Sequence, residues 1–223
     1  MFDAPLPHKR LEVANNIRST VIGTERPAMS VLSFGDECFV LSVGSPKTPH
    51  AGESARFSSE TIIWGYKEIR KRRCYWREKK LFVQRIFRSA NIALYQRKRE
   101  DQYHEGLVAS AVMCMVGRER IWVGNCGKTA AYCFGSRTLK LLTKMSLTPA
   151  LLGVVRYGLV AQMATRELGP EESILLTSSP LESREFGEVE RMLKEKMSHE
   201  DIAQMLKKYY GALSCILIKR LRD

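Results

Sequence analysis

The residues best suited to chemistry in this sequence are cations clustered between positions 66 and 100, with aromatic side chains among them. The cations are Lys67, Arg70, Lys71, Arg72, Arg73, Arg77, Lys79, Lys80, Arg85, Arg88, Arg97, Lys98 and Arg99. Tyr75, Trp76 and Phe82 are interleaved with them. Cations bind phosphate groups and aromatic rings stack on bases, so this pattern is typical of nucleic-acid binding. The alternative is a solvated helix face whose aromatic residues cover a sheet.

The overall charge supports the same classes of partner. The chain has 36 Lys and Arg against 24 Asp and Glu, a formal net charge of +12. Such a charge favours nucleic acids, acidic protein surfaces or anionic membranes as partners. We expect a protein partner that is acidic or phosphorylated, with nucleic acid as the alternative.

Cysteine and histidine residues show no metal or disulfide pattern. The six cysteines are scattered without Cys-x-x-Cys spacing, and the four histidines lie far apart in the chain. This predicts reduced thiols and a cytoplasmic protein, with no cofactor assigned. No run of about 18 apolar residues occurs, so we expect no membrane-spanning segment.

The elements that must position these side chains follow from hydrophobic patterning. A hairpin is predicted over 28–43, because two apolar runs are joined by Gly35-Asp36. A helix is expected from about Glu53, and a second, long helix over 66–100. Strands are predicted at 107–116, 121–125, 129–134, 138–143, 173–179 and 213–221, and helices at 183–196 and 199–209. The run 107–116 is a nearly continuous apolar run of small and branched side chains, broken only by Ser110, which indicates a strand buried on both faces.

This order of elements indicates an α+β fold. No repeat or linker divides the chain, so we predict one domain over 21–223, preceded by an N-terminal extension over 1–20.

Five segments, in order, resemble the metal-dependent serine/threonine phosphatases of the protein phosphatase 2C type. They are 39–62, which contains Ala51-Gly52-Glu53, then RIFRSANIAL (85–94), IWVGNCGKTAAYCF (121–134), TRELG (165–169) and SILLTSSPL (173–181). The resemblance implies an αββα sandwich of two antiparallel sheets flanked by helix pairs. It also implies an edge cleft where aspartates hold Mg²⁺ or Mn²⁺.

The positions that match the metal-binding aspartates carry other residues in this chain. The first falls on Val43-Gly44 or Gly44-Ser45, the turn aspartate on Lys128, and the next on Ser179. An ammonium group at Lys128 would repel a divalent cation. We therefore treat Gly44, Lys128 and Ser179 as vestigial metal-site positions, and assign no metal ligand and no catalytic residue.

These substitutions predict a pseudophosphatase: not an enzyme, but a phosphatase-like domain that serves as a protein-binding or regulatory module. Its cleft could hold a phosphate through Arg26 and Lys128. A basic face is predicted to bind the partner, formed by Arg70, Lys71, Arg72, Arg73, Arg77, Lys79 and Lys80. The alternatives are a divergent serine/threonine phosphatase with residual activity, and a nucleic-acid-binding protein that uses the region 67–99.

Overall fold

Two five-stranded antiparallel sheets form the centre of the computed structural model. The structure describes residues 17–22, 28–71, 79–97, 100, 106–117, 120–143, 150–170, 172–198, 201, 202, 204–206 and 215–220. The strands are β1 (Ile17–Ile22), β2 (Met29–Phe34), β3 (Cys38–Gly44), β4 (Ala109–Val116), β5 (Arg120–Cys126), β6 (Ala130–Gly135), β7 (Thr138–Leu141), β8 (Gln162–Glu167), β9 (Ser173–Thr177) and β10 (Cys215–Arg220). The helices are α1 (Ala51–Arg70), α2 (Lys79–Arg97) and α3 (Ser183–Lys194).

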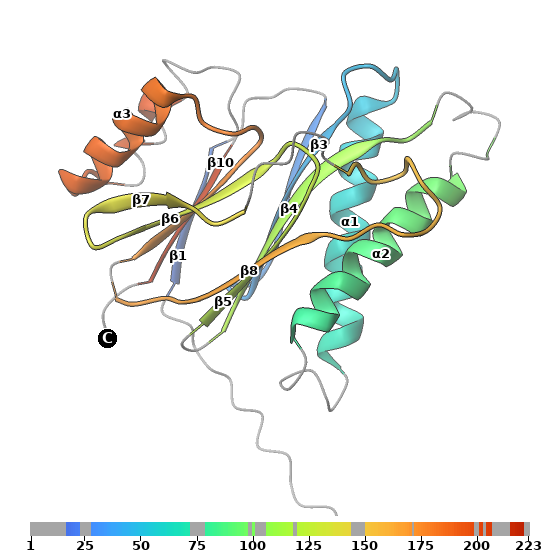
Figure 1. Cartoon of the computed structure of the whole chain (residues 1–223), viewed down its shortest axis with the longest axis horizontal. Coiled ribbons are helices and arrows are strands. Elements are labelled where there is room, and N and C mark those ends of the chain that lie inside the picture. Colours follow the sequence, from blue (N-terminus) through green and yellow to red (C-terminus); the bar gives the residue numbers. More distant parts are fainter. Residues whose placement is uncertain are drawn as a thin grey trace, which may run out of the picture.

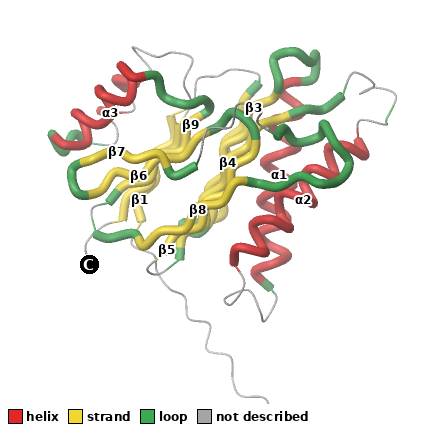
Figure 2. Tube along the Cα trace, in the orientation of Figure 1, coloured by secondary structure: helices red, strands yellow, loops and turns green. Residues whose placement is uncertain are grey.

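The strand order explains the layering (Figure 1). One sheet has the order β1-β10-β9-β6-β7 and the other β2-β3-β4-β5-β8. Helices α1 and α2 pack against the second sheet, and α3 covers the first, so helices lie on the two outer faces (Figure 2). The predicted α+β fold class and its αββα arrangement are confirmed.

Successive side chains on the central strands point to opposite faces of the sheet, and both faces contribute to the core. On β4, Ala111 and Met113 point toward the helices, whereas Val112 and Cys114 point toward the opposite sheet. Every residue of β4 is buried, which confirms the strand buried on both faces. Burying apolar area on this scale is the main contribution to stability.

The predicted long helix over 66–100 is wrong. Helix α1 continues to Arg70, and α2 begins at Lys79. Within α2, Leu81 is 52% exposed, whereas Phe82 and Val83 are buried. The two helices pack side by side, and each has its own buried face.

Two strands lie where we predicted none. Strand β1 pairs with β10 along its whole length and includes residue 20, the end of the predicted extension. Strand β8 forms the edge of the second sheet beside β5. The hairpin around Gly35-Asp36 is confirmed by the pairing of Phe34 with Cys38.

No helix in the described part of the chain is long and apolar enough to cross a membrane.

Candidate functional site

The three predicted vestigial positions meet at one end of the sandwich. Gly44 is the last residue of β3 and Lys128 lies in the turn between β5 and β6. Ala130 of β6 pairs with Thr177 of β9. Lys128 and Ser179 each lie two residues beyond that pair, on the same side, so the two sheets bring these positions to one edge.

Ser110 connects the two sides of this edge. It pairs with Val43 across β3 and β4, and its hydroxyl accepts a hydrogen bond from the backbone N–H of Lys128 at 3.0 Å. Gly127 has a φ of +92°, and a Cβ there would lie 2.6 Å from the Cβ of Ser110. Only glycine fits this turn, which fixes the backbone of Lys128. We call Gly44, Ser110, Lys128 and Ser179 the Lys128 edge.

Helix α1 begins at the same edge. A Cβ on Gly44 would overlap the backbone of Ala51, the first residue of α1, at 2.7 Å from its Cα. The backbone N–H of Ser45 donates to the carbonyl of Val108 at 2.8 Å, so the pairing between these two chain segments extends one residue beyond β3. The positive end of the α1 dipole therefore lies next to the Lys128 edge.

Lys128 carries the charge of this edge. Its side chain is exposed and makes no ion pair with a described residue. Ser179 is also exposed. An ammonium group, a hydroxyl and a helix N-terminus together favour an anion, and a phosphate monoester has that charge and the acceptor oxygens. Arg26, the second predicted phosphate contact, lies outside the described residues.

The predicted basic face is only partly a surface of available cations. Arg70 donates to Glu37 at 2.5 Å, and Glu37 also accepts from the hydroxyl of Tyr66 at 2.7 Å. Lys71 pairs with Glu68 at 2.6 Å. Lys80 is exposed, whereas Arg72, Arg73 and Arg77 lie outside the described residues.

Lys79 does not belong to an exposed face. It is only 7% exposed, and its ammonium group lies 3.6 Å from the centre of the Trp122 ring. Burial lowers its pKa to about 8, while the nearby Glu37 carboxylate opposes this shift. The cation–π contact offsets part of the cost of burying the charge. Nothing in the sequence indicates this contact, because Lys79 stands among many other lysines and arginines.

The lowered pKa of Lys79 predicts a pH dependence of stability. The unfolded chain holds this proton up to about pH 10.4, whereas the folded chain releases it near pH 8. Stability therefore rises with pH between these values. We expect the melting temperature of the wild type to rise relative to that of Lys79→Met across this window. Lys140→Met, at an exposed lysine of β7, should show no such trend, and a flat difference for Lys79→Met would contradict the assignment.

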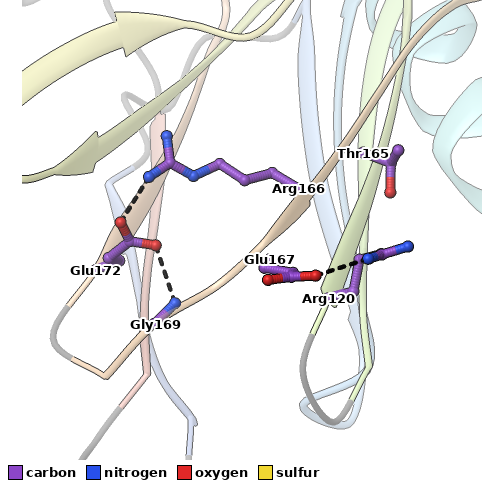
Figure 3. A pocket seen from close by; sticks show the side chains of 6 residues that line it. All are labelled: Arg120, Thr165, Arg166, Glu167, Gly169 and Glu172. Atoms are coloured by element: carbon purple, nitrogen blue, oxygen red, sulfur yellow. Dashed lines mark hydrogen bonds and ion pairs between the residues drawn. The ribbon is translucent and has the colours of Figure 1, made fainter.

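A recess lies at the end of the second sheet away from the Lys128 edge, where β5 begins (Figure 3). It has a volume of about 560 Å³ and is lined by Arg120, Thr165, Arg166, Glu167, Gly169 and Glu172. Its charges pair with one another: Arg120 with Glu167 at 2.7 Å, and Arg166 with Glu172 at 2.6 Å. Nothing in the sequence predicts this recess, because its residues come from separate segments that only the strand pairing brings together.

The two ion pairs of this recess should differ in strength. The Glu172 side chain is 18% exposed and also accepts from the N–H of Gly169 at 2.9 Å, whereas the Glu167 side chain is 76% exposed. We expect Glu172→Ala to lower the free energy of unfolding by about 1–2 kcal/mol. Glu167→Ala should cost less than about 0.5 kcal/mol. Urea denaturation measures both, and equal losses would contradict this difference.

Comparisons with known proteins give a match at the level of structure. No protein-family profile and no curated protein sequence matches the chain. The serine/threonine phosphatase Stp1 from Staphylococcus aureus superposes with a TM-score of 0.78 at 13% identity, covering 99% of this chain and 100% of that one. The catalytic domain of the serine/threonine phosphatase PstP, in complex with two manganese ions, gives 0.70 at 12% identity, covering 92% and 99%. PppA, a regulatory component of the type VI secretion system of Pseudomonas aeruginosa, gives 0.65 at 13% identity, covering 91% and 97%.

These matches confirm the predicted resemblance: the chain has the fold of protein phosphatase 2C-type serine/threonine phosphatases. They also contradict one prediction. We expected the chain not to be an enzyme, yet chains that match it over more than nine-tenths of its length include serine/threonine phosphatases, one of them a catalytic domain. That prediction is wrong, because it rested on the substituted positions alone, whereas proteins that share this fold include serine/threonine phosphatases.

The donors at the Lys128 edge do not fit a manganese ion. Such ions prefer carboxylate oxygens, whereas the described side chains of this edge are hydroxyls and an ammonium group. Across the described residues, no group of three or more His, Cys, Asp or Glu side chains gathers that could hold a metal. We derive no chemical step through a metal at this edge.

Proposed function

We propose that this chain is a regulatory module that binds a phosphorylated serine or threonine of a partner protein at the Lys128 edge. The exposed ammonium group of Lys128, on a turn that Ser110 and Gly127 fix, carries this proposal. A phosphoserine side chain carries nearly two negative charges and three acceptor oxygens. It complements both the ammonium group and the N-terminus of α1.

The partner is expected to be an acidic or phosphorylated protein, because the chain's net charge of +12 attracts it over a distance. We place the complex in the cytoplasm, since the five described cysteines are unpaired and buried. The exposed Lys80 lies at the start of α2, next to Lys79 and near Gly117 at the end of β4, so it is at the opposite end of the second sheet from this site.

The test is calorimetric titration with a phosphoserine peptide and with the same peptide unphosphorylated, at low salt. We expect measurable binding of the phosphorylated peptide only. Equal affinity for the two peptides, or no binding of either, would refute the proposal.

A second candidate is a divergent protein serine/threonine phosphatase. The match to a manganese-bound catalytic domain favours it. Release of inorganic phosphate from the same phosphopeptide in the presence of Mn²⁺ distinguishes the two candidates. Release that Lys128→Ala abolishes would identify Lys128 as part of a reaction site. Binding without release supports the regulatory module.

Nucleic-acid binding through residues 67–99 has less support. Of the cations in the predicted basic face, the described Arg70 and Lys71 are already paired with glutamates, and Lys79 is buried. A steep salt-dependent shift of a generic RNA probe, removed by charge reversal at Arg70 and Lys71, would restore this alternative.

A further inference from the structure

The loop over 153–160 exposes apolar side chains along the outside of α2. Val154 is 49% exposed, Val155 45%, Tyr157 67% and Val160 62%. Four large apolar side chains are thus exposed within one short segment, and clustered apolar exposure on a folded domain marks interaction sites.

Two buried or half-buried amides of α2 hold this loop in place. The side chain of Asn91, 1% exposed, accepts from the N–H of Gly153 at 2.9 Å and donates to the carbonyl of Val155 at 2.7 Å. The side chain of Gln84 donates to the carbonyl of Ala161 at 2.6 Å and accepts from its N–H at 3.1 Å. Both ends of the loop are thus hydrogen-bonded to α2, and Figure 2 shows the loop running alongside the helices. The fold therefore holds the apolar side chains of the loop in exposed positions.

The loop and the helix that holds it are cationic and contain no acid in their own sequences. Neither α2 nor the stretch 150–166 contains an aspartate or glutamate. Arg88 is exposed and lies about one helical turn from both Gln84 and Asn91, on the face that the loop follows. Arg156 is exposed within the loop itself. Leu81, 52% exposed one turn before Gln84, extends the apolar surface.

We propose that Val154, Val155, Tyr157 and Val160, with Arg88 and Arg156, form a membrane ridge that binds the surface of an anionic phospholipid bilayer. A bilayer leaflet places apolar chains directly beneath a layer of phosphates, which matches apolar side chains flanked by arginines. Tyrosine is enriched at this boundary. An acidic protein would match the arginines, but it is a weaker fit for four apolar side chains that project from a narrow loop.

The membrane ridge is independent of phosphopeptide binding at the Lys128 edge, and neither proposal requires the other. Peripheral binding of this kind also needs no membrane-spanning helix. Its effect would be to concentrate the protein on a leaflet, with the ridge facing the lipid.

Co-sedimentation of the full chain with vesicles tests the ridge. We use vesicles of phosphatidylcholine mixed in equal parts with phosphatidylglycerol, and vesicles of phosphatidylcholine alone. We expect binding to the anionic vesicles, and a loss of about tenfold or more in Val155→Ser/Tyr157→Ser. Arg88→Gln/Arg156→Gln should lose about fivefold per arginine removed. The matched control, Lys140→Gln/Leu141→Ser, changes an exposed cation and a 39% exposed leucine on β7, at the other side of the molecule (Figure 1). It should bind like the wild type.

Insertion of the loop is measured by placing tryptophan at position 157 and quenching its fluorescence with lipids brominated in their acyl chains. We expect quenching in Tyr157→Trp beyond that of the wild type, and no such gain in Leu141→Trp. Full binding by the serine variant, an equal loss in the β7 control, or no added quenching would overturn the proposal. So would loss of an acidic protein partner by the serine variant with vesicle binding unchanged, since the ridge would then be a protein-docking surface.

Discussion

Replacing Gly44 by alanine is expected to lower the free energy of unfolding by about 3 kcal/mol, the upper range for adding a methyl group to a packed site. The new Cβ would overlap the backbone of Ala51 at the start of α1. A backbone atom at a helix start cannot turn away as a side chain can, so α1 must shift from the end of β3. Because α1 begins at the Lys128 edge, the same substitution should also weaken phosphopeptide binding.

The matched control is Gly187→Ala in α3. A Cβ at Gly187 meets nothing within 4 Å, and alanine is favoured over glycine inside a helix by about 0.5–1 kcal/mol. The same chemical change should therefore stabilise α3 and destabilise the end of β3. Urea denaturation of both variants measures the contrast. A Gly44→Ala protein as stable as the wild type would show that α1 does not pack against β3 as described.

Replacing Lys128 by alanine is expected to weaken phosphopeptide binding by about tenfold to a hundredfold, because a hydrogen bond to a charged group contributes about 1.5–3 kcal/mol. The fold should be unaffected, since the lysine side chain is exposed and only its backbone N–H bonds to Ser110. Titration calorimetry at low salt gives the affinity, and the melting temperature reports on folding.

Two further variants separate a specific contact from a general effect of charge. Lys128→Arg keeps the cation and should retain most of the affinity. Lys140→Ala removes another exposed cation, from β7, and should leave the affinity almost unchanged when the titration is repeated at about 0.1 M salt, where charges more than about 10 Å apart are largely screened. Equal losses in Lys128→Ala and Lys140→Ala would mean that net charge alone attracts the peptide.

Local patterns were sufficient to predict the central strands, and the resemblance to a known family singled out Gly44, Lys128 and Ser179. The run 107–116 has no polar face, and this is what a strand between a helix layer and a second sheet requires. Gly44, Lys128 and Ser179 follow apolar runs that end in turns, so matching their segments to a known family placed all three at one edge. In the structure, these positions lie next to the paired residues Val43 with Ser110 and Ala130 with Thr177.

Features that depend on contacts between distant segments could not be predicted from the sequence. The sequence continues beyond Arg70 with further cations at helical spacing, so nothing local indicated that α1 ends at Arg70 and that α2 begins at Lys79. Lys79 is buried because Trp122 of β5 covers its ammonium group, a contact between residues more than forty positions apart. The loop over 153–160 is fixed by Gln84 and Asn91, and nothing in the sequence indicated that these two amides contact residues more than sixty positions away.

The most direct test of the central claim is to observe which backbone amides respond when a phosphoserine peptide binds. In a ¹⁵N-labelled sample of the full chain, we predict chemical-shift changes at Ser45, Gly127, Lys128 and Ser179 during titration with the phosphorylated peptide. The unphosphorylated peptide should cause none. Shifts confined to the recess around Arg120 and Glu172, or identical responses to the two peptides, would contradict the assignment of the Lys128 edge as a phosphoprotein-binding site.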